Sequence, residues 1–291
     1  MFDIPNCINA IQAAYPELQI TSAVPDTTGQ FNFVLLVNGQ YIFRFPRYEE
    51  GITVLEREAA VLDAVCYHLP LPVPNFAYRS LDSRTPGQVF VGYRRLPGVL
   101  LRGETLQAVS QSEKTVHRLA VQLAGFMDAL HHVRPSSVTV DLPLGGTPES
   151  WQQMYDEIRT LLFPHMRPDA RHWTTDHFEA YFQDTALHPY KPCLIHGDFG
   201  PGNVLYEPGS HAITGVIDFG FAGLGDPAQD IAAASCFGEP FIENMTSSYP
   251  HLHTLLPRAR FIKGTFALQE ALHGVKSGDR EAFESGMEQY R

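Results

Sequence analysis

The stretch that decides the fold reads LIHGDFGPGNVL over residues 194–205 and is followed by GVIDFG over residues 215–220. Each part opens with apolar residues that predict a short strand and continues into residues with oxygen-bearing side chains. Asp198 and Asn203 stand five positions apart on a loop rich in Gly and Pro, which holds them rigid and exposed. Asp218 ends the second strand. We therefore expect the three side chains to converge at one edge of a hairpin.

These three side chains suit a divalent cation. Mg²⁺ prefers hard oxygen ligands, and proteins bind it through one or two carboxylates together with phosphate oxygens and water. The motif therefore indicates Mg²⁺ as a cofactor.

The first 95 residues predict a small antiparallel sheet that carries one long helix. Strand patterns cover residues 20–24, 31–37, 40–45, 75–78 and 89–93, and Asn38-Gly39 between two of them is a strong hairpin signal. A helix is expected over residues 6–15. Apolar residues at helical spacing predict a second helix over residues 53–67, which the following prolines end.

From residue 96 onward the pattern changes to long amphipathic helices. We expect helices over residues 114–132, 149–163, 175–184, 227–237, 241–249, 257–274 and 280–290, with short apolar segments at 192–196 and 213–218. The expected fold class is therefore α+β. It consists of a sheet-rich lobe, residues 1–95, and a larger helical lobe, residues 96–291.

The composition excludes several classes of protein. With 291 residues, of which 44% are apolar, the chain can bury sizeable cores and is neither disordered nor collagenous. Four cysteines without CxxC pairing indicate neither a disulfide framework nor a zinc knuckle, and they favour a reducing cytoplasm. We expect neither export nor a membrane span, because no signal pattern and no long uncharged apolar stretch occurs.

The charge of the chain points to a cationic ligand. A net charge of −11 disfavours nucleic acid and anionic membranes as partners. Residues 1–96 contribute −2 and residues 97–291 contribute −9, so we expect a cationic substrate on the C-terminal part. The alternative is that the acidic surface serves only solubility. We expect the protein to be a monomer.

The motif resembles that of a known family. The pattern H-G-D-x-x-x-x-N stands at His196, Gly197, Asp198 and Asn203, and I-D-F-G stands at residues 217–220. Both are similar to motifs of the aminoglycoside phosphotransferase family, small-molecule kinases with the bilobal protein kinase fold, and the likeness covers nearly the whole chain. It is strongest to the aminoglycoside 2''-phosphotransferases, judged from YIFRFPR at 41–47, LPLPVP at 69–74, and Asp226-Pro227 with Asp230.

The resemblance implies transfer of a phosphoryl group from ATP or GTP to a hydroxyl group of an aminoglycoside. It assigns Asp198 to orient that hydroxyl and accept its proton, and Asn203 and Asp218 to hold Mg²⁺ on the phosphates. These residue types fit the chemistry, because phosphoryl transfer needs positioning and charge neutralisation more than covalent help. The His196 imidazole then braces the loop, and Gly197 permits a tight backbone.

The N-terminal lobe departs from the family pattern at one residue. The resemblance implies a lysine on the third strand that contacts phosphates and a glutamate on the next helix that holds it. The helix offers Glu58, with Glu56 as the alternative, but the strand offers Arg44, and no lysine precedes residue 114. Arginine is bulkier and presents a fixed fork. Arg44 in place of lysine could weaken the use of ATP, alter the geometry of the bound nucleotide or abolish activity. The alternative is a harmless replacement in a chain that uses Arg more often than Lys.

Further contacts are implied around the nucleotide and the acceptor. No GxGxxG loop is present, but backbone N–H groups of Thr28 and Gly29 can meet phosphates. Residues 93–98, with Tyr93 and Arg95, occupy the place of the linker that contacts the base. Three glutamates on late helices are candidate ligands for substrate ammonium groups, with a solvated helix face as the alternative for each: Glu239, Glu243 and Glu270.

Other polar residues are interpreted as structural. Asp226 and Asp230 lie at a helix start, where carboxylates are favoured, and are expected to cap the helix and brace a loop, with contact to the substrate as the alternative. His131 and His132 end a helical run, and packing or a role at the helix end is favoured over a metal site.

Several other functions stay open. Because related kinases share the motif, macrolides, choline, homoserine and sugars are alternative acceptors. A catalytically weak, kinase-shaped protein that binds nucleotides is a further alternative; Arg44 favours it, and the joint presence of Asp198, Asn203 and Asp218 opposes it. A metal-dependent hydrolase built on His196, Asp198 and Asp218 is the last alternative, and no further paired His/Asp motif supports it.

Overall fold

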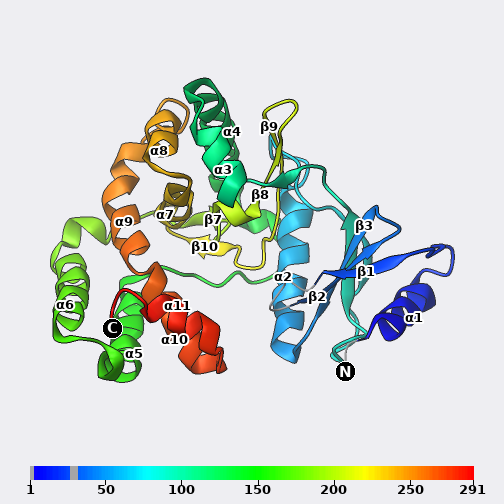
Figure 1. Ribbon diagram of the computed structural model, residues 1–291, viewed down its shortest axis with the longest axis horizontal. Coiled ribbons are helices and arrows are strands. Elements are labelled where there is room, and N and C mark those ends of the chain that lie inside the picture. The colour runs from blue at the N-terminus through cyan, green and yellow to red at the C-terminus, as the bar shows by residue number, and fades with distance from the viewer. Residues whose placement is uncertain (1–2, 27–31) are drawn as a thin grey trace.

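The computed structural model describes residues 3–26 and 32–291, with a sheet at one end of the molecule and a larger helical part at the other (Figure 1). The sheet is antiparallel and five-stranded, in the order β1-β2-β3-β5-β4. Two helices lie on its opposite faces. These elements are α1 (Ile4–Ala14), β1 (Ala23–Asp26), β2 (Asn32–Val37), β3 (Tyr41–Pro46), α2 (Glu49–Val65), β4 (Phe76–Ser80) and β5 (Phe90–Arg94).

The β2–β3 turn confirms the hairpin expected at Asn38-Gly39. Both residues have a positive φ, 53° and 66°, as the favoured two-residue hairpin turn requires. The Asn38 side chain also accepts hydrogen bonds from the N–H groups of Thr21 (2.8 Å) and Ser22 (3.1 Å). The turn therefore also fastens the chain that leads into β1.

The alternation of side chains along β3 directs Arg44 toward α2. Phe43 and Phe45 belong to the cluster on the α1 face, together with Cys7 and Ile11 of that helix. Because successive residues of a strand face opposite sides of the sheet, Arg44 lies on the face that α2 covers. The cation on β3 and the helix expected to carry its carboxylate partner thus face each other.

The C-terminal part consists of nine described α-helices and two small sheets. β6 pairs with β8, β8 pairs with β9, and β7 pairs separately with β10. The elements are β6 (Val99–Leu100), α3 (Gly103–Ser110), α4 (Glu113–His131), α5 (Pro148–Leu161), α6 (Pro168–Gln183), β7 (Cys193–Ile195), β8 (Val204–Glu207), β9 (Ala212–Val216), β10 (Gly223–Gly225), α7 (Ala228–Ala234), α8 (Glu239–Met245), α9 (Leu252–Gly264), α10 (Phe266–Ser277) and α11 (Arg280–Met287).

The two apolar segments of the motif lie in different small sheets and do not form one hairpin. The hairpin is made by β8 and β9, whereas β7 finds its partner in β10. The loops that follow β7 and β9 still lie side by side, because the N–H of Ile217 donates to the carbonyl of Asn203 (2.9 Å). The convergence expected from the sequence thus occurs between loops.

The single helix expected over residues 257–274 is divided into α9 and α10. At the junction, the N–H and the hydroxyl of Thr265 both donate to the carbonyl of Ile262, at 3.0 and 2.6 Å. This three-residue spacing tightens the last turn of α9 and replaces the regular four-residue ladder. Across the described ranges, no helix combines the length and the apolar character that crossing a bilayer requires.

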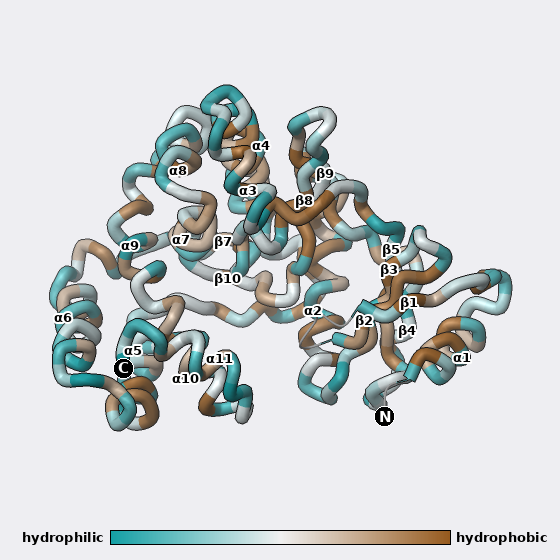
Figure 2. The backbone as a smooth tube through the Cα atoms, in the orientation of Figure 1, coloured by the Kyte–Doolittle hydropathy of each residue, from teal (hydrophilic) through white to brown (hydrophobic). Residues whose placement is uncertain are grey.

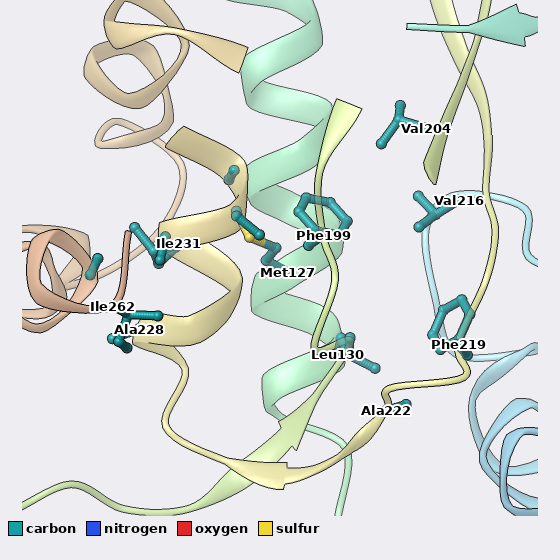
Figure 3. Packing of buried hydrophobic residues seen from close by; sticks show 14 of the residues in the cluster. Met127, Leu130, Phe199, Val204, Val216, Phe219, Ala222, Ala228, Ile231 and Ile262 are labelled. Carbon is teal, nitrogen blue, oxygen red and sulfur yellow. The ribbon is translucent and has the colours of Figure 1, made fainter. Parts of the chain in front are cut away.

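The hydrophobic core continues beneath the motif. Figure 2 shows the hydrophobic character of β8, the strand that follows the loop after β7. Phe199 stacks on Phe126 of α4 with ring centroids 5.5 Å apart, and Figure 3 shows its ring beside Met127. Phe219 is likewise fully buried, below Val216 in the same view. Each of these phenylalanines directly follows or neighbours a candidate site residue, so the core anchors both loops.

Candidate active site

A buried carboxylate holds the loop after β7. Asp230 of α7 accepts hydrogen bonds from the backbone N–H groups of His196 and Gly197, both at 2.9 Å, and contacts His131 Nε2 at 2.9 Å. Burial alone would raise the pKa of the Asp230 carboxyl, but the hydrogen bonds from His131 and from the backbone N–H of His196 bring it below its usual value. The expected bracing role of Asp230 is confirmed.

Asp226 has the capping role expected of it. Its Oδ1 accepts a hydrogen bond from the N–H of Ala228 (2.9 Å) at the start of α7. The same carboxylate forms an ion pair with Arg258 of α9 (2.5 Å), and both side chains are largely buried. Asp226 therefore belongs to the scaffold beneath the loop.

The His196 ring joins the two loops of the motif. Its Nδ1 accepts a hydrogen bond from the N–H of Asp198 (3.2 Å), so the ring proton resides on Nε2, which donates to the carbonyl of Ile217 (3.1 Å). The bracing role expected for this imidazole is confirmed. Because both nitrogens are engaged with backbone, the ring has no lone pair to offer a metal, which removes a ligand from the hydrolase alternative.

Gly197 meets a steric demand that only glycine satisfies. Its φ is +81°, and a Cβ at this position would lie 2.3 Å from the carbonyl oxygen of Phe221. A side chain here would push the loop after β7 away from the segment after β9. The tight backbone expected at Gly197 is confirmed.

Asp198 and Asn203 are joined directly. The Asn203 side-chain Nδ2 donates to the Asp198 carboxylate (2.7 Å) and to the Asp198 carbonyl (2.9 Å). These bonds use the amide hydrogens and leave Asn203 Oδ1 turned away from Asp198 as a lone-pair donor. Asp198 itself is exposed at the surface of the loop. The pair thus presents one carboxylate and one amide oxygen to an incoming ligand.

Asp218 adopts a strained backbone conformation. Its φ is +65°, a left-handed value that costs a residue with a Cβ about 1–3 kcal/mol. Its side chain is half exposed, and Oδ1 lies 3.4 Å from Arg44 Nη2. Backbone strain of this kind is often retained where a side chain must point in one direction for function.

Arg44 and Glu58 form a buried ion pair, as expected from the sequence. Arg44 Nη1 lies 2.6 Å from Glu58 Oε1, and Glu58 is almost completely buried. Glu56, the alternative partner, instead pairs with Arg84 at the surface (2.8 Å). Burial raises the pKa of the Glu58 carboxyl above its usual value, and the charge of Arg44 opposes that effect.

The remaining predicted contacts have mixed outcomes. Thr28 and Gly29 lie outside the described residues. Tyr93 is buried on the α2 side of the sheet, where burial raises its pKa to about 12 while the charge of Arg44 opposes the shift. Arg95 is exposed, and its N–H already donates to the carbonyl of Gln40 (2.7 Å). The N–H of Arg95 is therefore committed to the residue that directly precedes β3.

The three glutamates proposed as acceptor ligands are exposed on two helices of the C-terminal part. Glu239 and Glu243 lie on α8, and Glu270 lies on α10. No hydrogen bond or ion pair joins any of these described residues to Asp198, Asn203 or Asp218.

Two residues of the site were missed by sequence reasoning. His131 is buried, as expected, but it also supports Asp230, and Arg57 of α2 donates to the carbonyl of Gly220 (3.2 Å). Arg57 stands directly beside Glu58 in the sequence. A second cation next to the carboxylate that pairs with Arg44 was the available signal.

Comparison with known proteins agrees with this geometry. Residues 25–262 match the phosphotransferase enzyme family. The chain is 28% identical to viomycin phosphotransferase from Streptomyces vinaceus, with 90% of this chain and 91% of the relative covered. Among solved structures, the GDP complex of aminoglycoside 2'-phosphotransferase-IIIa superimposes with a TM-score of 0.89 at 25% identity, covering 99% of this chain and 97% of that one.

A second solved structure carries an acceptor as well as a nucleotide. The GDP and kanamycin complex of APH(2")-IIia superimposes with a TM-score of 0.88 at 27% identity and covers 97% of this chain and 96% of that one. The bilobal, kinase-like fold class expected from the sequence is confirmed.

Proposed function

The chain belongs to the phosphotransferase enzyme family, and on this premise we propose that it transfers the γ-phosphoryl group of ATP or GTP to a hydroxyl group of an aminoglycoside. One observation carries the proposal: Asp198 and Asn203 are joined on the loop after β7, and the loop after β9 presents Asp218 beside the Arg44–Glu58 pair. This arrangement combines a base, candidate metal ligands and a phosphate-directed cation.

Asp198 is the proposed catalytic base. Its carboxylate is exposed and is oriented by the amide of Asn203, so it can accept a hydrogen bond from an acceptor hydroxyl. As the hydroxyl oxygen forms its bond to the γ-phosphorus, the bond from that phosphorus to the bridging oxygen breaks and the hydroxyl proton passes to Asp198. Orienting the nucleophile in this way matters more than deprotonating it early, because the transition state of phosphoryl transfer is loose.

Asn203 and Asp218 fit the chemistry of Mg²⁺. The structure leaves Asn203 Oδ1 outside the Asn203–Asp198 hydrogen bonds, and the Asp218 carboxylate is half exposed. Both are hard oxygen ligands, and two such ligands suit a cation that completes its coordination with phosphate and water. When bound, Mg²⁺ would neutralise charge on the donor phosphates.

Arg44 is the proposed phosphate contact of the N-terminal lobe, residues 1–95. Its ion pair with Glu58 fixes the guanidinium, and its Nη2, whose contact with Asp218 is 3.4 Å long, has a second N–H for a phosphate oxygen. The intact pair supports an active enzyme over the catalytically weak alternative. On the sequence alone, Thr28 and Gly29 remain the proposed backbone contacts of the phosphates. The linker at Tyr93 and Arg95 remains the proposed contact of the base, through backbone groups other than the Arg95 N–H.

The acceptor is proposed to be cationic and to bind the C-terminal lobe, residues 96–291. That region carries −9 of the net charge of −11, and Glu239, Glu243 and Glu270 remain the candidate ligands for ammonium groups. The kanamycin in the structural relative supports an aminoglycoside. Four free cysteines suit the proposed location in the cytoplasm, and we propose that the enzyme acts as a monomer.

A coupled nucleotide-turnover screen tests this proposal. Purified enzyme is supplied with ATP or GTP and a panel of aminoglycosides, viomycin, macrolides, choline, homoserine and sugars. Turnover that depends on an aminoglycoside is the expected result. Turnover with another class alone would replace the acceptor while retaining the kinase, and binding of nucleotide without turnover on any acceptor would support the catalytically weak alternative.

A further inference from the structure

Helix α2 holds the segment after β9 through two neighbouring side chains. Glu58 Oε1 accepts a hydrogen bond from the N–H of Phe219 (3.2 Å), and Arg57 Nη2 donates one to the carbonyl oxygen of Gly220 (3.2 Å). Successive residues of a helix project about 100° apart, so both contacts form only because the Arg57 side chain is long. The two hydrogen bonds thus hold the N–H of Phe219 and the carbonyl of Gly220, the two residues that directly follow Asp218.

Asp218 requires this kind of support. Its left-handed φ of +65° is disfavoured for any residue with a Cβ. Such a conformation persists only where contacts from neighbouring residues hold the backbone in place. The side chain of Asp218 contributes little, because it is half exposed and its contact with Arg44 is 3.4 Å long. The backbone contacts that Phe219 and Gly220 make on one side of Asp218, together with those of Ile217 on the other side, therefore carry the conformation.

Arg57 has no ion pair that would explain its place. No carboxylate of the described ranges lies within ion-pair distance of its guanidinium, and its buried Nε lacks a hydrogen-bond partner. A partly buried guanidinium with an unused N–H donor lowers the stability of the fold, so the presence of Arg57 at this position needs another explanation. The hydrogen bond it does make runs from α2 to a residue 163 positions away.

We propose that Arg57 is a positioning residue for phosphoryl transfer. With Glu58, it holds Asp218 in the left-handed conformation that keeps the carboxylate exposed beside Arg44. Arg57 acts through Asp218 and contacts neither donor nor acceptor. The inference rests on the proposed function of Asp218 as a Mg²⁺ ligand and adds how that carboxylate is held in place.

The test compares Arg57→Ala and Arg57→Lys with a matched control, Arg84→Ala. Arg84 also binds α2, through Glu56 (2.8 Å), but at the surface and away from the segment after β9. For each variant we would measure kcat, the acceptor KM, the Mg²⁺ concentration that gives half-maximal rate, and thermal stability. Calorimetry would give the affinity for a non-hydrolysable nucleotide with Mg²⁺ and with EDTA.

Arg57→Ala is expected to lower kcat about tenfold and to raise the half-saturating Mg²⁺ concentration several-fold, with acceptor KM changed less than about twofold. Nucleotide affinity should fall with Mg²⁺ and stay constant in EDTA, Arg57→Lys should recover part of the loss, and Arg84→Ala should behave as the parent. A parental kcat and Mg²⁺ dependence in Arg57→Ala would overturn the proposal.

The proposal can still be tested if Arg57→Ala does not fold or if the parent enzyme is inactive. If Arg57→Ala does not fold, Arg57→Gln and Arg57→Lys carry the test, and a Mg²⁺ dependence equal to that of the parent in both would overturn it. If the parent enzyme phosphorylates no acceptor, the proposed function fails. The calorimetric comparison still decides the role of Arg57, because it requires no turnover.

Discussion

Arg44 Nη1 lies 2.6 Å from Glu58 Oε1, within a pair that is almost fully buried between β3 and α2. The second arm of the same guanidinium reaches Asp218 across the two lobes (3.4 Å). A lysine ammonium has one nitrogen and would have to share it among these groups, whereas the arginine fork gives each carboxylate its own donor. The departure from the family pattern therefore preserves the ion pair and adds a contact.

The first prediction concerns Arg44. Arg44→Ala should reduce kcat/KM for the nucleotide about 100-fold, because it removes a preorganised cation from the phosphates. Arg44→Lys should retain most of the activity, since the ammonium can still pair with Glu58. Steady-state kinetics at varied nucleotide concentration measure the effect, and thermal denaturation checks that the buried Glu58 tolerates the change. An alanine variant as active as the parent would show that phosphates are neutralised without Arg44.

The second prediction concerns Asp218 and Mg²⁺. Nucleotide binding should be stronger with Mg²⁺ than with EDTA, and Asp218→Ala should abolish most of this difference while leaving binding in EDTA unchanged. Isothermal titration calorimetry measures both affinities. Asp82→Ala, at an exposed aspartate distant in sequence from both loops, is the control. Equal affinities with Mg²⁺ and EDTA in the parent enzyme would contradict the assignment.

The third prediction concerns Gly197. Gly197→Ala should destabilise the protein by about 3 kcal/mol, because it combines a positive φ with a contact of 2.3 Å between the new Cβ and the Phe221 carbonyl oxygen. The midpoint of thermal unfolding should fall by roughly 6 °C or more. Gly200→Ala is a matched control in the same loop, since a Cβ there meets no atom within 4 Å. Equal midpoints for the two variants would refute the steric account.

The fourth prediction concerns the acidic C-terminal lobe. If its charge of −9 attracts a polycationic acceptor, the acceptor KM should rise steeply with salt, because the screening length falls from ~10 Å at 0.1 M to ~3 Å at 1 M ionic strength. The nucleotide concentration is kept saturating so that only acceptor binding is probed. A KM that is flat across the salt series would favour a macrolide or a sugar.

Local patterns explain what the sequence could predict. The loop from His196 to Asn203 could be predicted from the sequence because its glycines, its proline and its polar residues stand close together in the chain. The segments on both sides of the loop are apolar, which predicts strands there. The Arg44–Glu58 pair was predicted from the resemblance to the aminoglycoside phosphotransferases, which implies a cation on the third strand and a glutamate on the following helix. The loop depends on short-range geometry that local patterns capture, whereas the pair depends on the family pattern.

Contacts across long sequence separations explain what was missed. Arg57 and Gly220 are 163 positions apart, and His131 and Asp230 are 99 apart, so no local pattern relates either pair. The break between α9 and α10 was missed for a different reason: the Thr265 hydroxyl competes for a backbone carbonyl, and apolar spacing does not register such competition. These features follow from tertiary packing and side-chain hydrogen bonds.

Direct detection of the phosphorylated acceptor tests the central claim. Parent enzyme and Asp198→Ala are each incubated with Mg²⁺, a nucleoside triphosphate and an aminoglycoside, and the aminoglycoside is analysed by mass spectrometry. The parent should add one phosphate to the antibiotic, and Asp198→Ala should do so ~10²- to 10⁴-fold more slowly while its nucleotide affinity is unchanged. Equal rates of phosphate transfer by the two proteins would contradict the assignment of Asp198 and, with it, the proposed mechanism.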